Sequence, residues 1–191
     1  MSEGERKKSP IQAEMLVAVS AVFVGICALG VSLYEAHLMR QEQRAGVLPL
    51  LELSRSYFLR DGDSSDRWRL LFQAENVGIG PARILDFQVT VDGQPHATWR
   101  GAVNALVGEP IDVNYGQSTI NGRTIPADRS VTMFDLADTQ HTAAIVAELD
   151  RLDFQACYCS VFDECWTTTY QGGFGEIEPV AGCEVSSAFE E

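Results

Sequence analysis

The chain has 191 residues and a formal net charge of −13, because 27 acidic side chains outnumber 14 lysines and arginines. From residue 37 onward, 23 acidic side chains face only 11 arginines and no lysine. Binding to DNA or RNA depends on a basic surface that releases counterions from phosphate. The charge therefore disfavours nucleic acid as a partner, and the length predicts one domain with an appendage.

The first element is a run of residues without any charge, from Met15 to Tyr34. Twenty helical residues rise about 30 Å, which is the thickness of the hydrocarbon core of a bilayer. A cleaved signal peptide is the main alternative, but its apolar core usually spans only about 7–15 residues. We therefore predict a disordered cytoplasmic tail over 1–13 and a transmembrane helix over 14–36.

The residues after the span keep good helix formers until Gly46 and Pro49. They predict a juxtamembrane helical stalk over 37–47. Cationic side chains near the ends of a span indicate its orientation, and the N-terminal side holds slightly more of them. We therefore expect a bacterial inner-membrane protein with its N-terminus in the cytoplasm and its C-terminal domain in the periplasm.

Small side chains recur along the span at Ala21, Gly25, Ala28 and Ser32. This stripe would let a second helix approach closely, which points to a homodimer through the span. Small residues are also common in any membrane helix, so ordinary composition is the favoured explanation of the stripe and the dimer seam the alternative. Membrane lipid is the other partner that we expect for this helix.

After Pro49 the apolar pattern changes to a period of two, which predicts half-buried strands of an antiparallel sheet. Helices are expected at Trp99–Val107 and Thr139–Leu149. The expected strands are 51–57, 68–75, 85–91, Asp112–Ile120, Arg129–Leu136, Leu152–Phe162 and Trp166–Tyr170. The centre of the core is expected at Trp68, Leu70, Phe72, Leu85, Phe87 and Val89. We predict a mainly β fold, an antiparallel immunoglobulin-like β-sandwich over 48–185, followed by a disordered tail over 186–191.

A turn with the sequence Asn-Val-Gly-Ile-Gly-Pro-Ala separates the second and third expected strands, at 76–82. Gly78 and Gly80 permit positive φ, Pro81 stiffens the exit and Asn76 can cap the turn. The turn and its flanking strands resemble a motif of bacterial immunoglobulin-like modules of the cell-adhesion-related type. With one N-terminal span and a short stalk, the layout resembles uncharacterised proteobacterial single-span membrane proteins. The resemblance implies a fold, and it implies no activity and no catalytic residue.

Four cysteines lie near the C-terminus, at Cys157, Cys159, Cys165 and Cys183. The first two are two residues apart on a predicted strand, so they point to one face and are not expected to pair with each other. A hairpin turn between them and Cys165 would place Cys159 opposite Cys165, which leaves Cys157 for Cys183. We expect these two disulfides, with Cα atoms about 4.4–6.8 Å apart in each pair. A zinc site, a redox pair and free buried thiols remain alternatives, and the spacing fits zinc poorly.

Other motifs that suggest chemistry lack their required context. No helix follows Gly78 and Gly80 to bind a phosphate, and the acidic loop at 61–66 lacks the glycine and glutamate of an EF-hand. The histidines, His37, His96 and His141, match no local catalytic signature.

We therefore expect no cofactor, no metal and no catalytic residue. The expected function is a membrane-anchored envelope protein whose non-enzymatic domain binds or scaffolds an unidentified envelope protein. Two alternatives stay open. One is an envelope thiol–disulfide factor or other enzyme that uses Cys157 and Cys159, and the other is an accessory subunit of a membrane complex that acts through its span.

Overall fold

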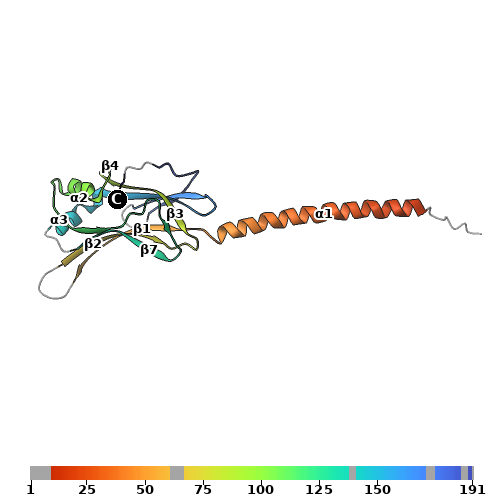
Figure 1. Ribbon diagram of the computed structural model, residues 1–191, viewed down its shortest axis with the longest axis horizontal. Coiled ribbons are helices and arrows are strands. Elements are labelled where there is room, and N and C mark those ends of the chain that lie inside the picture. The colour runs from red at the N-terminus through yellow and green to blue at the C-terminus, as the bar shows by residue number, and fades with distance from the viewer. Residues whose placement is uncertain (1–9, 61–66, 138–140, 171–174, 186–188, 191) are drawn as a thin grey trace, which may run out of the picture. The chain divides into compact units, whose positions relative to one another are not determined.

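The computed structural model describes the chain outside residues 1–9, 61–66, 138–140, 171–174, 186–188 and 191 (Figure 1). The chain divides into two compact units, Met1–Ala45 and Gly46–Glu191. The described part of the first unit is a single helix, α1 (Pro10–Ala45). It begins at Pro10, so the expectation of a disordered tail over 1–13 is wrong for 10–13, and the rest of that tail lies outside the described residues. The helix includes the predicted span over 14–36 and ends at Ala45, two residues before the predicted end of the stalk.

From Glu14 to Arg44, α1 is long and apolar enough to cross a membrane, and its side chains are exposed throughout this stretch. A helix that is apolar all round has no polar face to turn toward water. The predicted apolar helix near the N-terminus is therefore confirmed.

The second unit consists mainly of antiparallel strands in two sheets. Sheet A has four strands in the order β1–β2–β7–β5, and sheet B has the order β10–β9–β8–β3–β4, with β6 also paired to β3. The bounds are β1 (Leu51–Arg60), β2 (Arg67–Asn76), β3 (Ala82–Val91), β4 (Gln94–His96), β5 (Tyr115–Gln117), β6 (Thr124–Ile125), β7 (Arg129–Ala137), β8 (Leu152–Cys159), β9 (Cys165–Thr169) and β10 (Ile177–Val180). The prediction of a mainly β fold with antiparallel sheets is confirmed.

Three short helical segments accompany the sheets. They are α2 (Trp99–Val107), α3 (Thr142–Ala147) and the 3-10 helix η1 (Leu149–Arg151). α2 has the predicted bounds, begins at the side-chain cap of Thr98 and ends at Gly108 in the left-handed conformation. α3 and η1 stand where a helix was expected over 139–149 and extend to Arg151, and residues 139 and 140 of the expected helix lie outside the described residues. α2 and α3 are neighbours at one end of this unit (Figure 1).

Two expected strands are shorter in the structure. The strand expected over 112–120 is reduced to β5. β8 ends at Cys159 because Ser160 begins a hairpin turn, in which its backbone N–H donates to the carbonyl of Glu164 at 2.8 Å.

One hydrophobic core joins the two sheets. Phe72 of β2 lies against Phe154 of β8, with ring centroids 5.3 Å apart, and Trp99 of α2 stacks on Phe72 at the same distance. The expected core residues Leu70, Phe72, Phe87 and Val89 are all buried. The side chain of Trp68 lies outside the described part of the chain.

Leu85 is the exception among the expected core residues, since it is only half-buried. The register of β3 against β8 shifts between Ile84 and Asp86, so Leu85 is the extra residue of a β-bulge. A bulge reverses the alternation of faces along a strand. Ile84 and Phe87 therefore enter the core, and Asp86 lies on the outer face of sheet B opposite Cys157.

The expectation of a disordered tail over 186–191 is wrong for Phe189 and Glu190. Phe189 is buried, and its ring lies 5.3 Å from the rings of both Phe87 and Trp99. The side-chain amide of Asn121 donates to the carbonyl of Phe189 at 3.0 Å. Burial of the aromatic ring supplies the free energy that fixes Phe189 against the core, and 186–188 and residue 191 lie outside the described residues.

Candidate functional site

Asn76, the first residue of the Asn-x-Gly-x-Gly-Pro turn, lies fully buried at the end of β2. Its Oδ1 accepts hydrogen bonds from the backbone N–H groups of Leu50 at 3.2 Å and Gly78 at 3.1 Å. Its Nδ2 donates to the carbonyls of Gly80 at 2.8 Å and Ile125 at 2.9 Å. One side chain thus connects three segments of backbone, so the predicted cap is confirmed and joins more of the fold than a local turn.

Contrary to expectation, the two glycines of the turn are not needed for a positive φ. Neither Gly78 nor Gly80 has a φ in the left-handed region. A Cβ on Gly80 would overlap the carbonyl group of Val47, and a Cβ on Gly78 would overlap the backbone nitrogen of Leu50. These positions need glycine because the backbone before β1 passes too close for any side chain. Pro81 follows, as expected, at the exit into β3.

Four apolar side chains form an exposed patch at the start of the second unit. The backbone N–H groups of Val77 and Ile79 donate to the carbonyls of Leu50 and Leu48, which continues the register of β1 and β2. Cross-strand partners share a face, so the four side chains point to the outer side of sheet A. Leu48, Leu50, Val77 and Ile79 are 36–66 % exposed, and we call them the apolar patch. The patch could not be predicted from the alternating pattern, because the apolar side chains of β1 and β2 that the pattern marks point to the core, whereas these four point to the opposite face.

The cysteines pair as expected from strand alternation. Cys157 is bonded to Cys183, and Cys159 is bonded to Cys165. The Cα separation is 5.6 Å in the first pair, within the expected range. It is only 4.0 Å in the second, shorter than expected. Cys159 and Cys165 face each other directly across β8 and β9, at a non-hydrogen-bonded position where the strands approach most closely.

The two disulfides lie side by side on the outer face of sheet B. The Sγ atoms of Cys159 and Cys183 are 3.8 Å apart although they belong to different bonds. The sulfurs of Cys159, Cys165 and Cys183 all lie within 4.8 Å of one another, a spacing that could also hold a thiophilic metal ion if the thiols were free. Across the strands, Arg83 is the partner of Cys159 and Asp86 is the partner of Cys157.

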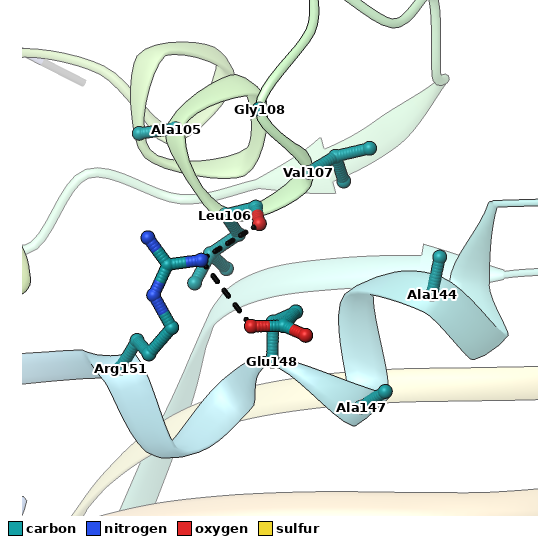
Figure 2. A pocket seen from close by; sticks show the side chains of 8 residues that line it. All are labelled: Ala105, Leu106, Val107, Gly108, Ala144, Ala147, Glu148 and Arg151. Atoms are coloured by element: carbon teal, nitrogen blue, oxygen red, sulfur yellow. Dashed lines mark hydrogen bonds and ion pairs between the residues drawn. The ribbon is translucent and has the colours of Figure 1, made fainter.

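A pocket of about 400 Å³ lies between α2 and the segment formed by α3 and η1 (Figure 2). Alanine and glycine make up half of its lining, at Ala105, Gly108, Ala144 and Ala147, and Arg151 lies at its edge. Arg151 donates to the carbonyl of Leu106 and to Glu148, both at 3.2 Å, and to Asp92 at 2.6 Å. The bond from Arg151 lowers the pKa of Asp92. The guanidinium is thus already neutralised by two carboxylates, which leaves the pocket no net positive charge for an anion.

The remaining residues considered in the sequence are dispersed. His37 lies on α1, His96 at the end of β4 and His141 at the start of α3. The acidic loop at 61–66 falls outside the described residues. Ala21, Gly25, Ala28 and Ser32 lie on the exposed surface of α1, where the homodimer seam stays a prediction.

Comparison with protein-family models found no match to this sequence, and comparison with curated proteins found none either.

Proposed function

We propose that this chain is a single-pass envelope membrane protein whose immunoglobulin-like β-sandwich binds or scaffolds another protein without an activity of its own. The observation that carries the proposal is α1, because a long helix that is apolar and exposed on every side is stable in lipid rather than in water. The core shared by two antiparallel sheets supports the sandwich. The resemblance of the turn at 76–82 supports the immunoglobulin-like type.

The proposed location is the inner membrane, with the N-terminus cytoplasmic and Gly46–Glu191 periplasmic. Disulfides persist in oxidising compartments, and both pairs in this chain are at bonding distance. The cations before the span support the same orientation.

The apolar patch supports the binding function. Exposed apolar groups rimmed by polar side chains are typical of interaction sites, and Glu52 and Glu75 border this one. The patch begins three residues after the end of α1, so it is joined to the proposed stalk by a short stretch of chain. We propose an apolar segment of another envelope protein as the partner of the patch.

Topology is tested by fusing alkaline phosphatase, and separately green fluorescent protein, after Glu191 of the full chain. We expect an active phosphatase and a dark fluorescent protein, because the first needs the periplasm and the second the cytoplasm. An inactive phosphatase beside a fluorescent partner would reverse the orientation.

Binding is tested by a photo-crosslinking side chain at Ile79, in cells that express the full chain. The matched control is Val161, an equally apolar exposed residue in the hairpin between β8 and β9. We expect an adduct with one envelope protein from position 79 and none from 161. Equal labelling from both positions, or none from 79, would contradict the role of the patch.

The thiol–disulfide alternative is supported by the contact between the two disulfides. If the purified chain turned over a reducible disulfide substrate and Cys157→Ser abolished this turnover, an enzymatic function would replace the non-enzymatic proposal.

The alternative of an accessory subunit is tested by exchanging the span for an unrelated one. Loss of function after this exchange would show that α1 carries the function.

A further inference from the structure

We infer that the two disulfides form a single exchange-coupled site, in which a protein dithiol reduces one bond and the electrons redistribute through a third pairing, Cys159–Cys183. The carrying observation is the 3.8 Å contact between the sulfurs of Cys159 and Cys183. Cys159 and Cys183 belong to different disulfides, so neither sulfur carries a hydrogen. Their contact is therefore a direct van der Waals contact between two disulfide sulfurs and not a hydrogen bond. Exchange requires a thiolate to reach a neighbouring disulfide sulfur, and this geometry provides the neighbour.

Exposure indicates where a reductant enters. Cys183 is the half-buried member of the cluster and lies on the segment that follows β10. Cys157 and Cys165 are 8 % exposed, and Cys159 is 1 % exposed. An external dithiol therefore reaches Cys183 before any other sulfur of the site.

The first step transfers two electrons. One thiolate of the dithiol attacks Sγ of Cys183, the Cys157–Cys183 bond breaks, and Cys157 leaves and takes up a proton. The second thiol of the dithiol then attacks the first sulfur of the same dithiol, which is bonded to Cys183 in the mixed disulfide. This releases Cys183 as a thiolate. The dithiol becomes a disulfide, and the protein holds two more electrons than before.

The second step transfers no net electrons. The thiolate of Cys183 attacks Sγ of Cys159, the Cys159–Cys165 bond breaks, and the Cys159–Cys183 bond forms. Cys165 leaves and takes up a proton from water. The free thiols are now Cys157 on β8 and Cys165 on β9, although the reductant met only Cys183.

The test uses the full chain in detergent micelles, with Cys27→Ser to remove the cysteine of α1 and with EDTA to remove metals. The protein receives one equivalent of dithiothreitol, is quenched in acid, alkylated and digested with chymotrypsin. Cleavage after Tyr158, Phe162 and Tyr170 places the four cysteines on separate peptides. We expect a Cys159–Cys183 peptide pair, together with alkylated Cys157 and Cys165.

Two variants test the same contact without a reductant. Cys165→Ser leaves Cys159 free beside the Cys157–Cys183 bond, and Cys157→Ser leaves Cys183 free beside Cys159–Cys165. Both should contain the Cys159–Cys183 bond, with native tryptophan fluorescence as the check that the variants fold. The inference is overturned if partial reduction of the parent chain yields only the two original pairs and their thiols. Because this experiment uses the parent chain, it tests the inference even if a variant does not fold.

Discussion

The ring of Phe189 meets the ring of Phe87 edge-on, with centroids 5.3 Å apart. The contact completes a path across sheet B, because the same segment begins at Val180, paired with Cys165 of β9, and is bonded through Cys183 to β8. Phe189 then reaches the core beside β3. Val180, Cys183 and Phe189 thus contact three strands that are distant from them in sequence.

Phe189→Ala should lower the free energy of unfolding by about 3–5 kcal/mol, as for other buried aromatic side chains. The loss combines the transfer of the ring with the cavity left between Phe87 and Trp99. Denaturant unfolding of the full chain, followed by tryptophan fluorescence, measures it. Val185→Ala is the control, since Val185 is 67 % exposed, and it should change the midpoint little. Equal stability of the two variants would mean that Phe189 is not anchored.

Gly80→Ala should destabilise the domain by about 3 kcal/mol, because the new methyl group would overlap the carbonyl of Val47 and force the backbone apart. Gly182→Ala is the matched control, since nothing lies within 4 Å of a Cβ there and its φ is not in the left-handed region. Thermal unfolding by circular dichroism compares the two. A Gly80→Ala melting temperature equal to that of Gly182→Ala would refute the close approach of the segment before β1.

Asn76→Asp removes the two amide donors and places a carboxylate against the carbonyls of Gly80 and Ile125. The expected cost is about 3 kcal/mol at neutral pH, because the site is fully buried. Burial would raise the pKa of the new carboxyl above its unfolded value, so the penalty grows as pH rises through that unfolded value and is smallest below it. Unfolding at pH 3 and pH 7 measures the difference. A penalty independent of pH would show that the carboxylate reaches water.

Arg69 and Asp135 form a two-pronged ion pair between β2 and β7, at 2.9 Å and 2.6 Å. The hydrogen bond from Arg69 lowers the pKa of Asp135 below its ordinary value. A depressed folded pKa stabilises the fold above the unfolded pKa of about 3.9, and this stabilisation is lost as pH falls through the folded value.

Asp135→Asn should therefore cost about 1 kcal/mol at pH 7, a modest figure because solvent screens a partly exposed pair, and much less at pH 2. Asp112→Asn is the control, since Asp112 is almost fully exposed and its pair with Arg100 is long at 3.5 Å. Urea unfolding across this pH range gives both values. A loss that persists unchanged at pH 2 would assign the effect to packing rather than to charge.

Patterns within short stretches of sequence predicted the elements whose form depends mainly on their own residues. Alternation predicted β1, β2, β3 and β7, the uncharged run predicted α1, and the two-residue spacing of Cys157 and Cys159 predicted which partners each would take. The place of Leu85 could not be predicted, because a bulge depends on the partner strand and leaves no sign in the alternating sequence.

Features that depend on distant segments were likewise beyond a local pattern. The glycines of the 76–82 turn are required by Val47 and Leu50, which precede the turn by a whole hairpin. Phe189 is a single aromatic residue among polar neighbours, and only the shape of the core beside Phe87 shows that it is an anchor. The contact between Cys159 and Cys183 follows from the path of the C-terminal segment, which no periodicity encodes.

The pairing of β2 with β7 has a consequence for how the chain matures. Phe72 lies opposite Phe134, so sheet A cannot close until more than half of the domain has been synthesised. Folds dominated by such non-local pairings form in milliseconds to seconds, far slower than helical bundles. Throughout that interval the hairpin of β1 and β2 presents an open edge and an apolar face, which are the features that promote aggregation. Protection of this one hairpin while the rest of the domain is being made should therefore favour productive folding.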